Sequence, residues 1–227
     1  MYLQVIGISQ VISHPGWDEE SKSNDLVIVK LNYPLTMGNN VKPACLPSAS
    51  YLPTNATENR CFTSGWGTLS PGTKHHKFFE FHEFLLIFFL KIVTANSFSL
   101  DGISPNHLQY VRVPAITTHQ CNIAYGEGIT DSMICAGYPN VGLKDSCEGD
   151  SGGPLVCNNG GNAVLAGVVS WGFGCADPEF PGVYARVTTA LNWIQSNMVY
   201  IVKKMIRHFS TEPSFYYLHR DCVLQDH

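Results

Sequence analysis

The chain has 227 residues; 44% are hydrophobic, only 14% are charged, and the formal net charge at pH 7 is −4. This length accommodates one large all-β domain or two small ones and is enough to bury a substantial core. The slightly acidic balance argues against nucleic acid and against a polybasic membrane patch as partners.

Short apolar, β-branched runs separated by turns predict strands along most of the chain. The first run, residues 27–31, precedes a turn-rich connection at 32–50 that carries three prolines. Residues 188–198 place apolar side chains at helical spacing and predict a late helix. Many short strands with Gly and Pro turns predict an all-β fold of the barrel or sandwich class. The other predicted strands are residues 61–69, 107–116, 163–172 and 182–187.

Two segments break this pattern. Residues 74–103 include an apolar run at 84–90, which is far shorter than the roughly 20 residues needed to span a bilayer. Residues 199–227 are basic, aromatic and unpatterned. We interpret both segments as mis-spliced or read-through sequence, with an amphipathic membrane anchor as the alternative.

Eight cysteines are widely spaced and include no C-x-x-C pair. This spacing argues against zinc ligation and favours a disulfide framework, so we expect a secreted or extracellular protein. The first ten residues, however, contain neither a basic region nor a long apolar run of the kind found in signal peptides. The two observations conflict, which predicts that the sequence is truncated.

The stretch DSCEGDSGGPLVC, residues 145–157, is typical of a strand and turn around a serine nucleophile. Glycines on both sides of Ser151 leave its backbone free to adopt a sharp turn. A serine hydroxyl is a weak nucleophile unless a neighbouring base takes its proton. The stretch therefore raises the question of where a base lies.

Taken together, six stretches resemble the trypsin-like, chymotrypsin-fold serine endopeptidases. The resemblance covers about residues 8–73 and 104–198, and the GDSGGP motif within its flanking sequence is very specific. The stretches are NDLVIVKL (24–31), CFTSGWGTL (61–69), DSMICAGY (131–138), DSCEGDSGGPLVC (145–157), VVSWGFGCADPEFPGVYARV (168–187) and NWIQSNM (192–198).

The resemblance implies an all-β, chymotrypsin-like double β-barrel with a short C-terminal helix. Residues 1–45 would be the remnant of an incomplete first barrel. Residues 46–198 would form the linker and a complete second barrel, interrupted by the atypical insert at 74–103. Residues 199–227 would be an atypical tail.

The resemblance also implies catalytic roles for particular residues. Ser151 corresponds to the nucleophile, and the backbone N–H groups of Gly149 and Ser151 to the oxyanion hole. Asp25 corresponds to the triad aspartate that orients the catalytic imidazole. Such a mechanism needs no cofactor and no metal.

Substrate recognition follows from the same comparison. Asp145 corresponds to the floor of the primary specificity pocket, where a carboxylate favours Arg or Lys. Ser170, Trp171 and Gly172 correspond to the wall that pairs with the substrate backbone. Gly172 and Gly182 would leave room for a long basic side chain.

The family pattern implies three disulfides and leaves Cys45 and Cys222 over. Asn55 begins an N-A-T glycosylation sequon in a linker that we expect to be exposed. The implied bridges are Cys61–Cys157, Cys121–Cys135 and Cys147–Cys175.

The catalytic histidine is missing from the matching region. Family members carry it in an AAHC segment well upstream of the aspartate, whereas His14 is the only histidine before Asp25. We interpret His14 as a solvated loop residue. The family's activating Ile/Val-Val-Gly-Gly terminus, whose amine would pair with Asp150, is also missing.

We therefore predict a trypsin-like serine endopeptidase that cleaves after Arg or Lys, in a truncated and inactive form. Its partners would be protein or peptide substrates and protein protease inhibitors, without nucleic acid and without a membrane span in this chain. A non-catalytic, protease-like binding module is the alternative. A membrane-tethered protease that uses the tail as an anchor is a third hypothesis, which the lack of a long apolar stretch disfavours.

Overall fold

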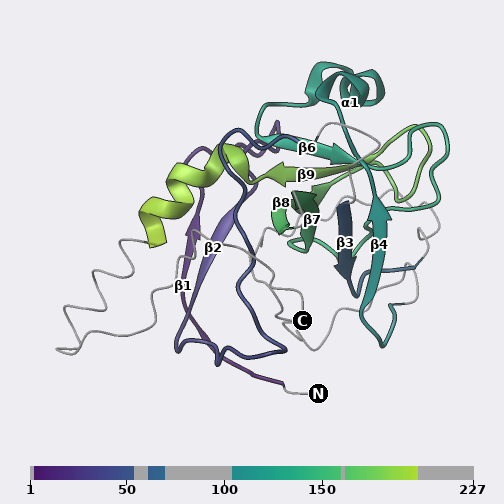
Figure 1. Ribbon diagram of the computed structural model, residues 1–227. Helices are drawn as coiled ribbons and strands as arrows, with labels where there is room; N and C mark the ends of the chain where they lie inside the picture. The colour runs from purple at the N-terminus through teal and green to yellow at the C-terminus, as the bar shows by residue number, and fades with distance from the viewer. Residues whose placement is uncertain (1–2, 54–60, 70–103, 160–161, 199–227) are drawn as a thin grey trace.

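The computed structural model describes residues 3–53, 61–69, 104–159 and 162–198. These residues form a two-stranded sheet, a seven-stranded sheet and short helices (Figure 1). The atypical segments at 74–103 and 199–227, the sequon at Asn55 and Cys222 lie outside the described residues.

The two-stranded sheet pairs β1 (Ile8–Ser13) with β2 (Val27–Leu31) in antiparallel register, with Ile12 opposite Ile28. Within the described part of the chain, no other strand joins this sheet. All side chains of β2 are half-buried, and four of the six in β1 are exposed. The first barrel is thus represented by two strands whose apolar side chains are only partly covered.

The seven-stranded sheet is antiparallel throughout and curls into a nearly closed barrel. Its strand order is β4-β3-β7-β8-β9-β6-β5. The two edge strands are consecutive in the chain and are separated only by Pro114, so the same stretch of backbone runs along both edges. Proline cannot donate to a strand ladder, which is why the predicted strand 107–116 is broken in two. The strands are β3 (Cys61–Gly65), β4 (Gln109–Val113), β5 (Ala115–Ile116), β6 (Met133–Ala136), β7 (Pro154–Asn159), β8 (Asn162–Trp171) and β9 (Gly182–Arg186).

The predicted late helix begins as a 3-10 turn at Thr188–Ala190 and continues as a helix at 191–198. Its buried Leu191 and Ile194 pack against β8 and β9 and against Leu26, at the start of β2. The helix therefore holds the beginning of β2 against the barrel. Together with the nearly closed sheet, it confirms the predicted chymotrypsin-like, all-β class.

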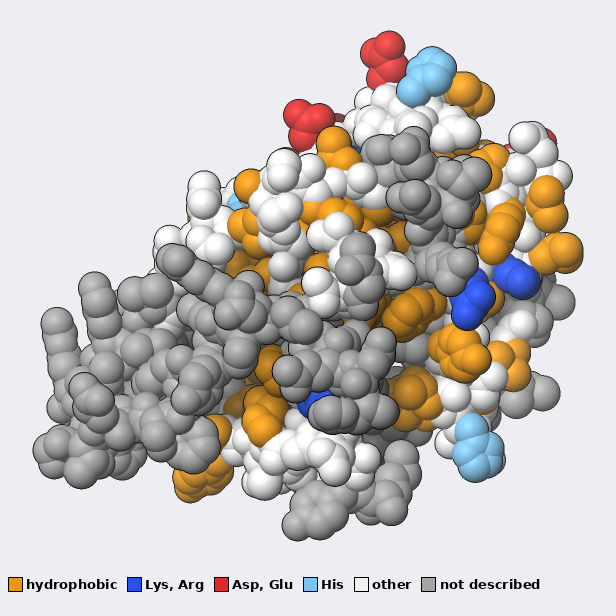
Figure 2. All heavy atoms as spheres, viewed as in Figure 1, with side chains coloured by type: hydrophobic (Ala, Val, Ile, Leu, Met, Phe, Trp, Pro, Cys, Tyr) orange, Lys and Arg blue, Asp and Glu red, His pale blue; other side chains and the backbone are white. Residues whose placement is uncertain are grey.

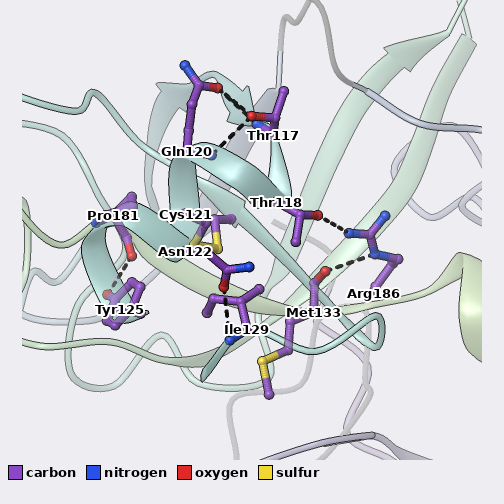
Figure 3. Close-up of a disulfide and its surroundings, with 11 residues drawn as sticks. Thr117, Thr118, Gln120, Cys121, Asn122, Tyr125, Ile129, Met133, Pro181 and Arg186 are labelled. Atoms are coloured by element: carbon purple, nitrogen blue, oxygen red, sulfur yellow. Dashed lines mark hydrogen bonds between the residues drawn. A yellow bond between two sulfur atoms is a disulfide. The ribbon is translucent and has the colours of Figure 1, made fainter. Parts of the chain in front are cut away.

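One helix was not predicted. Helix α1 (Thr118–Tyr125) begins with a capping box, in which the Thr117 hydroxyl accepts from the Gln120 N–H and the Gln120 side chain accepts from the Thr117 N–H (Figure 3). The T-x-x-Q pattern is the sequence signal that predicts such a start. Cys121 is the only buried residue of α1, so the apolar periodicity that normally reveals a helix is weak.

Figure 2 shows hydrophobic side chains spread over much of the visible face, with few charged side chains among them. Large exposed apolar residues include Tyr110, Leu143 and Phe173. The low charged fraction of the sequence is therefore evident at the surface.

Candidate active site

Asp25 is held in a buried position at the junction between the two sheets. It is 6% exposed, and its Oδ2 accepts a 2.6 Å hydrogen bond from the Ser170 hydroxyl of β8. Burial raises the pKa of the Asp25 carboxyl above its ordinary value, while the Ser170 hydrogen bond and the charge of Lys22 lower it. The resemblance implies a role for the Ser170 segment in the substrate wall, and the structure adds a contact of the Ser170 side chain with Asp25.

Ser151 lies in a tight turn immediately before β7. Gly152 donates its N–H to the Val169 carbonyl at 3.0 Å, and the Val169 N–H donates to Gly153 at 2.9 Å. Gly152 and Gly149 have φ angles of 77° and 92°, which favour glycine. Ser151 is exposed at this turn, and its hydroxyl forms no hydrogen bond with another described residue.

The proposed oxyanion donors are the N–H groups of Gly149 and Ser151. Within the described ranges neither group has a hydrogen-bond acceptor, so both are free to bind an oxygen of a ligand. Gly149 is fixed by close packing, because a Cβ atom there would lie 3.2 Å from the Cα atom of Gly67.

Asp145 lies partly buried between three backbone segments. Its Oδ1 accepts the N–H of Ser146 at 2.8 Å, and its Oδ2 accepts the N–H of Ala176 at 3.2 Å. A Cβ atom on Gly182 would collide with the carboxylate. Burial raises the pKa of Asp145 to about 6, and the backbone hydrogen bonds only partly offset this effect.

The wall segments beside Asp145 lie close together. A Cβ atom on Gly172 would be 3.9 Å from the Cα atom of Gly182, which is ordinary van der Waals contact. The segments that carry the two glycines therefore lie close together beside Asp145.

An aromatic cluster that the sequence analysis missed supports this wall. The Tyr125 ring lies 4.9 Å from that of Trp171, 5.4 Å from that of Phe173 and 5.4 Å from that of Phe180. The Tyr125 hydroxyl donates to the Pro181 carbonyl at 2.7 Å (Figure 3). Burial raises the pKa of Tyr125 to about 12, so the hydroxyl remains a donor at neutral pH.

The Asp150 carboxylate lies close to Gly65 and Gly67, at the end of β3. Its two carboxylate oxygens accept the N–H groups of Gly67 at 2.7 Å and Cys147 at 2.9 Å. The carboxylate faces a cavity of about 200 Å³. Lining residues of this cavity include Gly65, Gly67, Leu143, Lys144, Asp145 and Asp150.

The histidines of the described residues do not contact Ser151. The His14 ring packs on Trp193 at 4.7 Å, and its Nδ1 accepts the N–H of Gly16 at 3.1 Å. The His14 ring is partly buried against Trp193 and is therefore less solvated than the sequence predicted. This loss of solvent lowers the pKa of His14. His107 lies just before β4, and His119 lies in α1; both are exposed.

Three disulfides brace these loops. They are Cys61–Cys157, Cys121–Cys135 and Cys147–Cys175, the pairs that the resemblance implied. Cys147–Cys175 joins the Asp145 loop to the segment that carries Ala176. Cys45, which the three implied bridges leave over, is also disulfide-bonded.

Among the described residues, none of the helices has the length and hydrophobicity to cross a membrane. In the same residues, no group of three or more His, Cys, Asp or Glu side chains is arranged to hold a metal ion.

Comparison with known proteins places this geometry in a family. The Trypsin family model matches residues 3–80 and 94–194. Trypsin-1 of Astacus astacus is 41% identical over 86% of this chain and 69% of its own length. Trypsin-2 of Salmo salar is 37% identical over 86% of this chain and 68% of its own length. Transmembrane protease serine 9 of Rattus norvegicus is 37% identical over 82% of this chain, which spans 15% of that protein. The chain spans roughly two thirds of the length of these trypsins. It belongs to the trypsin-like, chymotrypsin-fold family of serine proteases.

Proposed function

We propose that this chain carries the nucleophile and the specificity pocket of a secreted serine endopeptidase that cleaves after Arg or Lys. The observation that carries the proposal is the Asp145 carboxylate, which is partly buried beside Gly182 and receives only two backbone N–H groups. Because burial raises the pKa of Asp145 to about 6, a bound guanidinium or ammonium would stabilise its charged form.

In this proposal Ser151 attacks the carbonyl of the scissile bond. The free N–H groups of Gly149 and Ser151 stabilise the oxyanion that forms. Asp25, fixed by Ser170, orients and stabilises an imidazole that takes the serine proton. The segment from Ser170 to Gly172 pairs with the substrate backbone, and protein protease inhibitors would bind in the same cleft.

We also propose that the chain as given is nearly inactive. His14 is engaged with Trp193 and Gly16, which leaves no described imidazole to accept the Ser151 proton. The Asp150 carboxylate accepts two backbone N–H groups instead of an amine. Loss of the base or nucleophile of such a triad costs about 10⁶ in turnover.

The inactivity is tested by assaying the purified chain against an arginyl ester, with Ser151→Ala as the control. We expect the two proteins to be indistinguishable. Turnover by the chain well above that of Ser151→Ala would mean that some base reaches the serine, and the inactivity proposal would be wrong.

The specificity is tested in a chimera that joins the histidine-bearing first part of a trypsin, with a cleavable activation terminus, to this chain. We expect cleavage after Arg and Lys, and we expect Asp145→Ser to lose most of that preference because the buried cation would have no partner. Glu148→Gln, an exposed change in the same loop, is the control and should retain the preference. A folded chimera that binds peptides without cleaving them would favour the non-catalytic binding module instead.

A further inference from the structure

A chain of hydroxyl groups joins the turn before Asp25 to the second barrel. The Ser23 hydroxyl donates to Thr130 Oγ1 at 3.1 Å, and Thr130 Oγ1 shares a 2.9 Å hydrogen bond with Ser132 Oγ. The backbone N–H of Asn24 donates to Ser132 Oγ at 3.0 Å. These contacts link residues that are 107 and 108 positions apart in sequence.

The turn that these contacts hold has an unfavourable backbone. Lys22 and Asn24 have φ angles of 57° and 56°, in the left-handed region that most non-glycine residues avoid. Immediately afterwards, the Leu26 N–H donates to the Asn24 carbonyl at 2.8 Å across Asp25. The direction of the Asp25 side chain therefore depends on Asn24 keeping this conformation.

Ser132 is well suited to hold Asn24, because Ser132 is itself fixed. Its side chain is 9% exposed, and its carbonyl accepts the Arg186 N–H of β9 at 2.7 Å. The Arg186 side chain donates to the carbonyl of the next residue, Met133, at 2.8 Å (Figure 3). By contrast, the Asn24 side chain donates only to Gly16, within the same loop.

We infer that Ser132, supported by Thr130 and Ser23, is a positioning residue for the Asp25 carboxylate. Asp25 is anchored on one side by the hydroxyl chain at Asn24 and on the other by Leu26, which packs in the core with Leu165 and Val168. With both neighbours fixed, the carboxylate meets the Ser170 hydroxyl. The claim that this positioning serves catalysis rests on the proposed function. The positioning itself can be tested without that function.

The test is an NMR titration of the Asp25 carboxyl carbon in the intact chain, assigned by comparison with Asp25→Asn. In Ser132→Ala, we expect the pKa of Asp25 to fall toward its ordinary value of 3.8, because burial is the largest cause of its elevation and a loosened turn admits water. We also expect the Asn24 amide to exchange about 10-fold faster, as the loss of one hydrogen bond predicts. Ser132→Thr, which keeps the hydroxyl, should restore both quantities, and the exposed Ser196→Ala should change neither.

Unchanged titration and unchanged exchange in a folded Ser132→Ala protein would overturn the inference. If that variant does not fold, Thr130→Val removes the next hydroxyl of the chain and should shift both quantities in the same direction by a smaller amount. No shift in Thr130→Val would then overturn it. Because neither readout requires turnover, failure of the proposed protease activity would leave this result standing.

Discussion

The Ser170 hydroxyl donates a 2.6 Å hydrogen bond to the carboxylate of Asp25, which lies 145 residues away in sequence. The residue before Ser170, Val169, exchanges backbone hydrogen bonds with Gly152 and Gly153 in the Ser151 turn. Two consecutive residues of β8 therefore hold the aspartate and the serine turn in place. Four predictions follow from this arrangement and from the pocket beside it.

Replacing Ser170 with alanine should raise the pKa of Asp25. The hydroxyl stabilises the charged carboxylate, so its loss leaves the opposing effect of burial uncompensated. The measurement is an NMR titration of the Asp25 carboxyl carbon, with Ser196→Ala as the control. A pKa that stays the same or falls would contradict this view of the contact. The direction is opposite to that expected for Ser132→Ala, so the two roles can be told apart.

The titration of Asp145 should destabilise the protein as the pH rises. Its pKa is about 6 in the folded chain and 3.8 ordinarily, so the folded state binds the proton more tightly. The contribution to stability is fully present below about pH 4 and is lost as the pH rises to about 6 and beyond, for a total of about 3 kcal/mol.

Urea unfolding at several pH values tests this expectation. The free energy of unfolding of the wild-type chain should fall by about 2.4 kcal/mol more than that of Asp145→Asn between pH 4 and pH 7. Glu148→Gln, in the same loop, should follow the wild type. If the free energies of unfolding of the wild type and Asp145→Asn changed equally with pH, the pKa of Asp145 would not be raised in the folded chain.

Replacing Gly182 with alanine should destabilise the chain by about 1–3 kcal/mol. The new methyl group would collide with the Asp145 carboxylate, which is held by two backbone N–H groups and cannot move freely. Gly128→Ala is the matched control, because a Cβ atom there meets nothing within 4 Å. Equal free energies of unfolding for the two variants would mean that the Asp145 side chain can move aside at little cost.

Removing the Cys147–Cys175 disulfide should cost about 3.6 kcal/mol by loop entropy. The bridge spans 28 residues, whereas Cys121–Cys135 spans 14, so the double serine variant of the shorter bridge should lose about 0.6 kcal/mol less. Urea unfolding of the two double variants measures the difference, after peptide mapping of the oxidised chain has verified the pairing. Mapping that joins Cys147 to another cysteine would contradict the structure.

Much of the fold could be predicted from local pattern alone. The strand at 27–31 has the predicted bounds, because a β-branched apolar run between turns has few other stable conformations. Helix α1 was missed because its single buried residue produces almost no periodicity. The short strands β1 and β6 were missed because their conformation depends on pairing with other strands.

The sequence by itself determined the protease family, the serine turn and the acidic residues at positions 25 and 145, because motifs record which side chains are present. Only the tertiary structure decided which groups meet. The contacts of Ser170 with Asp25 and of Ser132 with Asn24 join residues more than 100 positions apart in sequence. Such contacts depend on how the barrel closes and how its loops pack, and no local pattern of residues encodes them.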